Sequence, residues 1–539
     1  MNLLGIHGGV TVNQHDAAAA LIMDGRLVCC VEEERLMRVK TATGMLPIES
    51  ISACLKEGGI TIRDVDLVML PGETYDDIEQ RTSEWLTHHF GYAPKIEKMN
   101  HQTAHLAAAF YHSGYPEAMC LSYDAYGDGI SGSMGTASRK EGMGVIETIP
   151  GENSLGVFYA TMTSFLGFKP GEDEYKVMGL APYGKPEIDL SFFCRPTESG
   201  FASDASYFRS RRRATAYEPY YSPKLVERLG PPRRKGEPVS QHYKNIAAST
   251  QAVLEACAVS LVKHLHERTG KRSLCLAGGV ALNCSANRLV AKLDFVDHFF
   301  VQPASSDRGL ALGCALYAAA RNGETIQPIP HVFYGPTRPE DEIEKAIALS
   351  GAVATMVDDP SDAAAALLAQ GKIVAWYQGR SEFGPRALGH RSILADPGKP
   401  NMKDEINRRV KFREEFRPFA PSVLDERYPE IYDLKESSPY MTIACDVLDG
   451  WGARVPATTH VNNTARVQTV SADVDPLYHA LIAKFAERTG RPVVLNTSFN
   501  IMGQPIVERP LEAISTFAGC GIDALVIGNH LIEKQESDH

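Results

Sequence analysis

The sequence predicts an α/β fold in two domains, and three observations lead to this prediction. At 539 residues, the chain exceeds what a single hydrophobic core normally organises. The most proline-dense break in its middle, at Ile326–Pro330 and Gly335-Pro336, divides it into expected domains of residues 1–330 and 331–539. Short apolar runs typical of strands alternate with segments of helical spacing, which is the pattern of α/β layers.

Composition and charge exclude several classes of protein. Hydrophobic residues make up 44% of the chain and charged residues 22%, which is ordinary for a soluble globular enzyme. The formal charge of −11 argues against a nucleic-acid partner, because such binding needs a broad basic face. The chain lacks an initial basic segment followed by a long apolar run, and no later run approaches membrane-spanning length. We therefore expect a cytoplasmic protein with no membrane partner. Eleven cysteines without a CxxC pair predict buried thiols.

The first elements expected along the chain are antiparallel strands. Apolar runs predict strands at 3–6, 17–23 and 27–31, and Asp24-Gly25 is a strong hairpin signal. Strands are expected again at 118–123, 131–138 and 144–148, with the acidic, glycine-rich loop Asp124–Gly129. This repetition indicates a duplicated fold; in actin-like and sugar-kinase ATPases, paired hairpins of this kind face each other across a phosphate cleft. The acidic cluster Glu32–Glu34 is interpreted as a solvated strand end.

A histidine pair lies between the two strand groups. His101 and His105, within Asn100–Phe110, are four residues apart and share one face of a helix. Imidazole suits zinc, iron and nickel, and a divalent metal would need carboxylates to complete its site. The alternative is a helix that packs a polar face under a loop.

The middle of the chain contains several segments with weaker signals. Residues 171–184 have no clean period and are interpreted as a loop, and the basic stretch 193–237 as a surface excursion; the role of Arg209–Arg213 stays open. Helical spacing over 241–269 predicts a buried helix, followed by a strand at 273–276. The glycine turn at 278–279 then offers backbone N–H groups to an anion or nucleotide, or is a plain tight turn. After a short strand at 299–302, Asp307 is placed as the N-cap of a helix that runs through Ala320.

The second domain contains the densest motif. Helices are expected at 340–350 and 360–370, with strands at 354–357, 373–376 and 493–496. Between Arg380 and Arg417 there are ten Lys or Arg residues against six Asp or Glu. Guanidinium forks grip phosphates, and the interleaved glycines let the backbone approach a ligand, so this block predicts an oxyanion site. Asn496, Ser498 and Asn500 alternate, which predicts either a hydrogen-bonding floor or a polar strand end.

Together these motifs resemble one family over nearly the whole chain: the ATP-dependent O-carbamoyltransferases of the tobramycin and nodulation-factor type. The resemblance rests on His15-Asp16 with Glu32–Arg35, His101 with His105, Asp124 with its GDG loop, EYKVMGLAPYG at Glu174–Gly184, GGVALN at Gly278–Asn283, SSDRG at Ser305–Gly309, GRSEFGPRALGHRSIL from Gly379, and FREEFRPFAPSV from Phe412. Two of these blocks, together and in order, are highly specific.

The resemblance implies two catalytic domains and a two-step reaction. The larger domain is expected to be like the tRNA threonylcarbamoyl transferase branch of the actin-like ATPases, and the smaller one like the twisted α/β enzyme that makes threonylcarbamoyl-adenylate. The smaller domain would form carbamoyl-adenylate from carbamoyl phosphate and ATP. The larger domain would pass the carbamoyl group to a hydroxyl of a small-molecule natural product, as in antibiotic biosynthesis.

The resemblance also assigns roles to individual residues. The implied metal ligands are His101, Asp124 and Asp307, with His105 as a less certain fourth, and Fe(II) as the expected ion with Mg as the alternative. His15 is expected nearest the acceptor hydroxyl, and Lys40 at a phosphate or carbamoyl group. The implied adenosine cradle is Gly278, Gly279 and Asn283. The implied carbamoyl-phosphate and nucleotide contacts of the smaller domain are Arg386, Lys411, Arg417, Arg466, Asn496 and Ser498.

Three other hypotheses compete with this one. An actin-like small-molecule kinase or ATPase would release ADP and would not need the Arg386 block. A tRNA threonylcarbamoyl-type modification enzyme would need a broad basic surface, which the pI near 5.9 disfavours. A purely structural protein is the least favoured. The acceptor is not readable from the sequence, and a homodimer is expected only because it is the commonest assembly.

Overall fold

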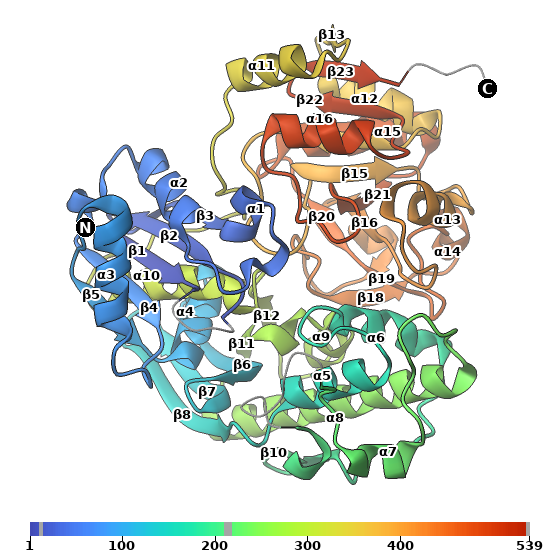
Figure 1. Cartoon of the computed structure of the whole chain (residues 1–539). Helices are drawn as coiled ribbons and strands as arrows, with labels where there is room; N and C mark the ends of the chain where they lie inside the picture. The colour runs from blue at the N-terminus through green and yellow to red at the C-terminus, as the bar shows by residue number, and fades with distance from the viewer. Residues whose placement is uncertain (10–13, 210–217, 535–539) are drawn as a thin grey trace. The chain divides into compact units, whose positions relative to one another are not determined.

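The computed structural model describes residues 1–9, 14–209 and 218–534 (Figure 1). It contains two compact units. The first comprises Met1–Asp66, Leu86–Pro94 and Ile329–His539, and the second comprises Leu67–Trp85 and Lys95–Pro328. The chain passes from the second unit to the first inside the predicted proline-rich break. The functional domains expected at 1–330 and 331–539 stay a prediction, because the compact units reflect packing alone.

The first unit begins with an antiparallel three-stranded meander. Its elements are β1 (Asn2–His7), β2 (Ala18–Met23), β3 (Arg26–Glu32), α1 (Glu33–Met37), η1 (Lys40–Ala42), α2 (Ile48–Gly58) and η2 (Ile62–Asp64). β1 pairs with β2 and β2 with β3, with Met23 opposite Arg26. Asp24 and Gly25 both have positive φ, at 48° and 74°, as a two-residue hairpin turn of the primed type requires. The predicted hairpin is therefore confirmed.

The rest of the first unit is built on an eight-stranded sheet in the order β13-β23-β22-β14-β15-β21-β16-β20, with a second sheet β17-β18-β19. Its strands are β13 (Thr355–Met356), β14 (Val374–Tyr377), β15 (Arg391–Ala395), β16 (Ala420–Leu424), β17 (Tyr432–Asp433), β18 (Ala444–Val447), β19 (Thr464–Arg466), β20 (Gln468–Val470), β21 (Val493–Ser498), β22 (Ala524–Ile527) and β23 (His530–Glu533). Its helices are α11 (Glu340–Ser350), α12 (Pro360–Ala369), α13 (Met402–Ile406), η7 (Asn407–Lys411), η8 (Tyr428–Glu430), α14 (Trp451–Arg454), α15 (Pro476–Thr489) and α16 (Pro510–Ala518).

Alternation along β14 shows that helices cover both faces of this sheet. Val374 and Trp376 pack with α12 and α15, whereas Ala375 and Tyr377 pack with α11, α13 and α16 (Figure 1). Successive side chains of a strand point to opposite faces, so a strand covered on both sides reads as a continuous apolar run. This is the physical basis of the strand predicted at 373–376.

The second unit is organised around a five-stranded sheet in the order β12-β11-β6-β7-β8. Its strands are β4 (Leu67–Pro71), β5 (Ile96–Met99), β6 (Glu117–Gly127), β7 (Ile130–Ser138), β8 (Gly142–Pro150), β9 (Cys194–Thr197), β10 (Gly200–Ser203), β11 (Ser273–Ala277) and β12 (His298–Val301). Its helices are α4 (His101–Ser113), α5 (Leu155–Phe165), α6 (Glu174–Leu180), η3 (Ala181–Tyr183), η4 (Ala205–Tyr207), α7 (Pro223–Leu229), α8 (Gln241–Thr269), η5 (Gly279–Leu282), α9 (Cys284–Ala291), η6 (Asp307–Gly309) and α10 (Leu310–Arg321). A further helix, α3 (Ile78–Phe90), passes from one unit to the other.

The same series of elements occurs twice along the chain. Three consecutive antiparallel strands, β1–β3, precede the parallel pair β4 and β5. Likewise, the antiparallel strands β6–β8 precede the parallel pair β11 and β12. The predicted α/β class is confirmed, and the repeated series is that of the predicted duplicated fold.

Several sequence expectations are wrong. Residues 171–184 are largely helical, because α6 and η3 occupy Glu174–Tyr183. Glu32, Glu33 and Glu34 are 2–4% exposed and not solvated. The stretch 193–237, predicted as a surface excursion, is mostly exposed or half-buried over its described residues and contains β9, β10 and α7; its Arg233 is the exception to a basic surface, being buried with Nε donating to the Leu166 carbonyl. Arg211–Arg213 lie outside the described residues.

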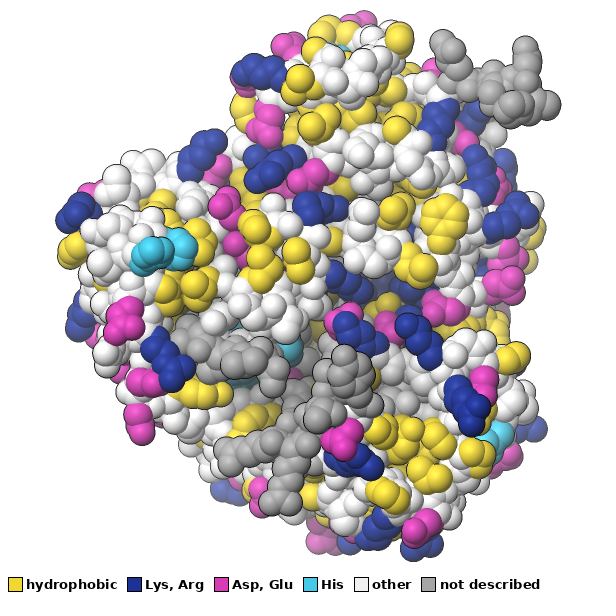
Figure 2. Space-filling model, in the orientation of Figure 1, with side chains coloured by type: hydrophobic (Ala, Val, Ile, Leu, Met, Phe, Trp, Pro, Cys, Tyr) yellow, Lys and Arg dark blue, Asp and Glu magenta, His cyan; other side chains and the backbone are white. Residues whose placement is uncertain are grey.

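Two further expectations concern apolar residues. All eleven cysteines are free and buried, as predicted. Among the described residues, α8 is long and apolar enough to cross a membrane by length and composition, which corrects the expectation that no run reaches that length. The 18-residue window concerned is 61% buried inside the protein, and core helices commonly have this character. On the face shown in Figure 2, basic and acidic side chains are interspersed.

Candidate metal centre and candidate anion site

The histidine pair begins α4, as predicted. Asn100 caps this helix by accepting hydrogen bonds from the backbone N–H groups of Gln102 and Thr103. His101 and His105 therefore lie one turn apart, with ring centroids separated by 4.9 Å, and are only 7% and 0% exposed. A polar face this deeply buried requires partners from other elements.

Two carboxylates supply those partners. Asp124 lies near the end of β6, and Asp307 opens η6. The Nε2 atom of His101 lies 3.4 Å from Asp124 Oδ2 and 3.5 Å from Asp307 Oδ1. The Nε2 atom of His105 lies 3.5 Å and 3.7 Å from the same two oxygens. The structure thus brings together all four residues predicted as metal ligands. The N-cap residues of η6 and α10 are Ser306 and Gly309, so the expected N-cap position of Asp307 is wrong.

The pKa values show that this cluster attracts positive charge. Burial lowers the pKa of His101, but the charge of Asp307 and hydrogen bonds with Asp124 and Asp307 outweigh burial and raise that pKa from 6.5 to about 10. Burial would raise the pKa of Asp124, yet hydrogen bonds from His101 and His105 bring it below its usual value. The two buried carboxylates therefore favour a positive charge, which the protonated His101 supplies and which a bound cation would supply in place of that proton.

Backbone contacts hold the ligands in place. A Cβ on Gly127 would lie 2.3 Å from the His101 ring, so this position has no room for a side chain. The Gly279 N–H donates to Asp124 Oδ1 at 3.1 Å, which leaves Oδ2 facing the histidines. Asp128 accepts from the His101 backbone N–H at 2.8 Å and from Thr74, anchoring the start of α4. The sequence signal for Asp128 was the GDG loop, but its anchoring role was not predicted.

The donor set fits a divalent transition metal. One ligand atom from each of the four residues lies within 4.8 Å of every other. Both ring nitrogens of His105 are buried, and its Nε2 faces Asp124 Oδ2 at 3.5 Å and Asp307 Oδ1 at 3.7 Å, the spacing of groups that could share one ion. Two imidazoles with two carboxylates suit iron, manganese or zinc better than Mg²⁺, which prefers oxygen ligands.

The predicted adenosine cradle lies beside this cluster. Gly278 has φ +87°, and a Cβ there would lie 2.3 Å from the Tyr123 carbonyl oxygen. Asn283 caps α9 by accepting from the Ala286 N–H and exchanges two hydrogen bonds with Gln251. These contacts explain why the turn has a glycine at 278, where a side chain would clash, and an asparagine at 283, where the side chain caps a helix. A nucleotide role for Gly278, Gly279 and Asn283 stays a prediction.

The predicted anion site of the first unit centres on Lys411. This lysine closes η7, a π-helical turn of a kind that is rare and frequently functional, and is only 4% exposed. Its Nζ donates to the Asn500 carbonyl and Oδ1 atoms at 3.0 and 2.8 Å, and to the Ser498 carbonyl. Burial, followed by the charges of Arg413 and Arg417, lowers the pKa of Lys411 well below 10.5.

The other predicted residues of this anion site differ in what they contact. Ser498 donates to Asn500 Oδ1 at 2.7 Å and belongs to the Lys411 cluster. Asn496, 1% exposed, donates to Ala387, Ser422 and Gln468, so it braces the loop that carries Arg386. Arg417 forms an ion pair with Glu414 at 3.7 Å and Arg466 ends β19, while Arg386 is half-buried. Substrate contacts of these three arginines stay predictions.

Two arginines of the basic block have structural partners instead of an expected phosphate. Arg391 is fully buried, donates to the carbonyls of Gln378 and Gly379, and lies 3.6 Å over the Tyr377 ring. Arg380 donates to the Gly335 and Tyr334 carbonyls. The oxyanion interpretation therefore does not extend to the whole block.

Sequence reasoning missed two residues of this region. Glu382, 1% exposed, accepts from the backbone N–H groups of Leu388, His390 and Arg391 and so shapes the loop around Arg386. Burial, with the charges of Arg466 and Lys403, lowers the pKa of His460 from 6.5 to about 3. Glu382 lies within the GRSEFGPRALGHRSIL block, which is its sequence signal although the block does not show its role, whereas the lone His460 carries no spacing signal.

His15 and Lys40 lie in one loop cluster of the first unit. The N–H of Asp16 donates to the Thr41 carbonyl at 2.6 Å, and the His15 ring lies 3.5 Å from the Asp16 carboxylate. Asp16, Thr41 and Ala42 all have positive φ. For a β-branched residue such as Thr41, this is a strained conformation of the kind that clusters at functional sites. Catalytic roles for His15 and Lys40 stay predictions.

Comparisons with known proteins match most of this chain to one family. A family model described as carbamoyltransferase N-terminus matches residues 6–93 and 72–316, and one described as carbamoyltransferase C-terminus matches residues 365–534. Nodulation protein NolNO of Sinorhizobium fredii is 37% identical over 97% of this chain and 79% of its own length. Nodulation protein NolO of Bradyrhizobium diazoefficiens is 39% identical over 81% of this chain and 79% of its own length.

Similarity to solved structures is weak. Component A of the Acidaminococcus fermentans (R)-2-hydroxyglutaryl-CoA dehydratase is 16% identical, with a TM-score of 0.32 over 60% of this chain and 99% of that one. HypF of T. kodakarensis is 13% identical, with a TM-score of 0.33 over 60% of this chain and 48% of that one. These scores carry no argument about function. The two family models, which together span most of the sequence, and the identity to NolNO show that the chain belongs to the carbamoyltransferase family.

Proposed function

We propose that this protein is an ATP-dependent O-carbamoyltransferase that acts through carbamoyl-adenylate. The observation that carries the proposal is the presence of two separate buried centres in a carbamoyltransferase. One gathers two histidines and two carboxylates, and the other gathers cations around Lys411. A group transfer in two steps needs one centre for a polyphosphate and one for the acceptor.

The first step activates a poor electrophile. Water releases phosphate from carbamoyl phosphate and leaves carbamate, whose oxygen attacks the α-phosphorus of ATP; the bond to pyrophosphate breaks and carbamoyl-adenylate forms. Lys411, Arg417 and Arg386 would stabilise the charge that spreads over the phosphoryl oxygens. An anionic ligand would also favour the charged form of Lys411 and offset the cost of burying it.

The second step transfers the carbamoyl group. The acceptor hydroxyl attacks the carbamoyl carbon, the bond to AMP breaks, and His15 takes the hydroxyl proton as general base. His101, His105, Asp124 and Asp307 would hold a divalent metal, which supplies Lewis-acid polarisation of a carbamoyl or phosphate oxygen. Lys40, Gly278, Gly279 and Asn283 are proposed to contact the carbamoyl-adenylate.

The acceptor is proposed to be a hydroxyl-bearing small molecule, in line with the nodulation proteins among the relatives. The test is incubation of the purified protein with carbamoyl phosphate, ATP and Fe(II) or Mg²⁺. Carbamoyl phosphate-dependent release of pyrophosphate and AMP supports the proposal. Release of ADP alone would indicate a kinase or ATPase, and absence of pyrophosphate would exclude the adenylate route.

A further inference from the structure

The short helix α1 holds loops from both expected reaction centres at once. It consists of Glu33–Met37 and follows β3, which ends at Glu32. The four charged residues Glu32–Arg35 are 0–4% exposed. Charged side chains are almost never buried this completely unless they are paired, so each of these four must have a partner.

Glu32 and Arg35 both hydrogen-bond to the backbone of one residue of the basic block, Gly384. The Gly384 N–H donates to Glu32 Oε1 at 2.5 Å, and Arg35 Nη2 donates to the Gly384 carbonyl at 2.5 Å. Both hydrogen-bonding groups of this glycine are therefore satisfied by one ion pair, in which Arg35 Nε lies 3.9 Å from Glu32 Oε2. Pro385, which is rigid, and then Arg386 follow directly. The two hydrogen bonds to Gly384 therefore set the backbone position of Arg386.

Glu34 hydrogen-bonds to a second loop, Lys40–Ala42. Its Oε2 atom accepts from the Thr41 backbone N–H at 2.7 Å, and its Oε1 atom lies 3.7 Å from Arg35 Nε. Thr41 has φ +64° and directly follows Lys40. A strained residue persists only where its surroundings hold it, and the buried Glu34 carboxylate is such a hold.

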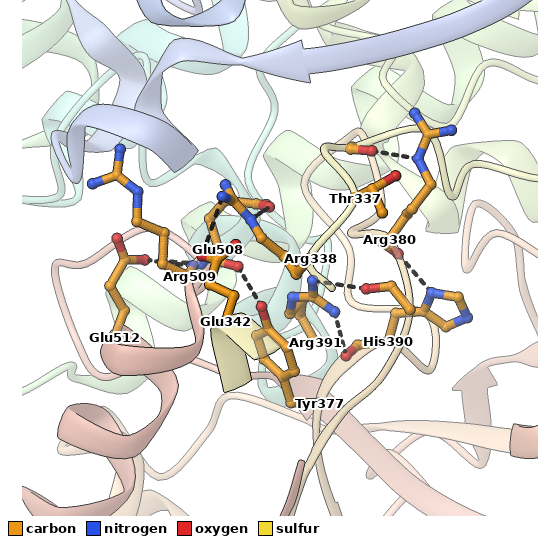
Figure 3. Close-up of polar contacts among 12 residues, drawn as sticks. Thr337, Arg338, Glu342, Tyr377, Arg380, His390, Arg391, Glu508, Arg509 and Glu512 are labelled. Atoms are coloured by element: carbon orange, nitrogen blue, oxygen red, sulfur yellow. Dashed lines mark hydrogen bonds and ion pairs between the residues drawn. The ribbon is translucent and has the colours of Figure 1, made fainter. Parts of the chain in front are cut away.

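Arg38, the C-cap residue of α1, hydrogen-bonds to a third loop, which contains Pro505 and Ile506. Arg38 donates to the carbonyls of Ile506 and Pro505 at 2.6 and 3.1 Å. The next residue, Val507, donates its N–H to the Phe499 carbonyl, beside the Ser498 that contacts Lys411. Figure 3 shows Arg338 and the Tyr377 hydroxyl directed toward Glu508 at the end of this loop, so the loop is fixed from both sides.

We propose that α1 is a positioning element shared by the two half-reactions. Through Glu32 and Arg35 it sets the Gly384–Arg386 loop for carbamoyl phosphate and ATP, and through Glu34 it sets the Lys40–Ala42 loop for transfer. This inference rests on the proposed function. It assigns Glu32, Glu34 and Arg35 to positioning, because they bind the backbone of the two loops and contact one another.

Glu33 provides a matched control within the same helix. It is as buried as Glu32, but its carboxylate accepts from the Glu49 and Ser50 N–H groups and from the Ser50 hydroxyl, and so caps α2. Glu33→Met and Glu34→Met make the same chemical change one residue apart. The double variant Glu32→Gln/Arg35→Met removes the ion pair without changing the net charge of the cluster.

The experiment combines carbamoyl phosphate-dependent ATP–pyrophosphate exchange with hydrogen–deuterium exchange of peptides covering 40–44 and 384–388. We expect Glu34→Met to deprotect 40–44 and to leave pyrophosphate exchange within twofold of wild type. We expect Glu32→Gln/Arg35→Met to deprotect 384–388 and to raise the KM for carbamoyl phosphate at least tenfold. Glu33→Met should deprotect only the start of α2.

Two outcomes separate this inference from the proposed function. If wild type exchanges pyrophosphate, but Glu34→Met and the double variant behave as Glu33→Met does, the inference is wrong and the proposed function stands. If wild type shows no carbamoyl phosphate-dependent exchange, the proposed function is wrong. Thermal melting of each variant is recorded beside both readouts, so that a variant that unfolds is recognised and replaced by the corresponding Glu→Gln change.

Discussion

The His101 cluster of the second unit and the Lys411 cluster of the first both bury charged side chains, but they balance charge in opposite ways. At His101, opposite charges lie together, and the pKa of the histidine rises to about 10. At Lys411, cations lie near one another, and the pKa of the lysine falls well below its ordinary value. These opposite charge balances support our proposal that the first cluster binds a cation and the second an anion.

The two clusters also differ in how they are built. The metal-ligand candidates come from a helix start, a strand end and a short turn, whose backbones fix the side chains directly. Lys411 instead ends a π-helical turn and is oriented by hydrogen bonds to Ser498 and Asn500. Neutral acceptors do not neutralise the positive charge of this lysine, and an anionic substrate would do so.

The largest expected effect is on the metal centre. Asp124→Ala should weaken binding of Fe(II) at least about a hundredfold, because it removes a buried charged ligand that faces both histidines. Anaerobic titration and elemental analysis would measure this. Glu147→Ala, an exposed carboxylate of β8 that pairs with His264 and Arg268, is the control and should retain the metal. Equal metal content in both variants would show that the cluster is not a metal site.

The next effect concerns Lys411. Lys411→Met should lower carbamoyl phosphate-dependent pyrophosphate exchange about a hundredfold or more. It should leave the melting temperature unchanged or higher, because a buried, unbalanced charge costs stability. Arg409→Met, on the same turn but paired with Glu405 and Asp523, is the charge-matched control, with exchange expected within threefold of wild type. A large loss of stability in Lys411→Met without a loss of exchange contradicts this account.

A smaller effect is expected at Gly127. An alanine there would place a Cβ 2.3 Å from the His101 ring, so the ring must shift and metal affinity should fall about tenfold. Gly144→Ala, on β8 of the same sheet with nothing within 4 Å of its Cβ position, should have no effect. The comparison is a metal titration of both variants. Unchanged affinity in Gly127→Ala would mean that His101 need not lie where it does.

The smallest effect is a pH dependence in the cationic region. The pKa of His460 is about 3 when folded and 6.5 when unfolded, so the unfolded state binds more protons between these values. Stability should therefore fall as pH drops from 6.5 toward 3, by up to about 1.4 kcal/mol per pH unit for this group. Urea unfolding of wild type and His460→Gln at several pH values would show a shallower slope in the variant. Parallel slopes would contradict the depressed pKa.

Much of the fold could be predicted from the sequence. Period and turn signals located α8 and α11 at their observed bounds and placed the hairpin at Asp24-Gly25. The loop prediction for 171–184 is wrong because the glycines and charges of this segment hide a short helix, α6, which is stabilised by packing on α8. The predicted exposure of Glu32–Glu34 is wrong because charged residues are usually exposed. Only the fold shows that Gly384, Ser50 and Thr41 supply partners for them in the interior.

The candidate sites were predictable to different extents. The four metal-ligand candidates, His101, His105, Asp124 and Asp307, lie together in the structure, while their role as metal ligands stays a prediction. Their assembly from residues up to about 200 positions apart was not derivable from spacing, and came from the family resemblance. At the anion site, a count of arginines could not tell Arg391, which binds backbone carbonyls, from cations whose charge lies near Lys411.

The most direct test of the central claim compares Asp124→Ala and Lys411→Met in both partial reactions. The claim is that the two centres divide the work, with adenylate formation at Lys411 and carbamoyl transfer at the histidine cluster. Asp124→Ala should keep carbamoyl phosphate-dependent pyrophosphate exchange within about threefold of wild type while losing metal, whereas Lys411→Met should keep metal and lose exchange. If both variants lose exchange equally while remaining folded, the two centres do not divide the reaction in this way.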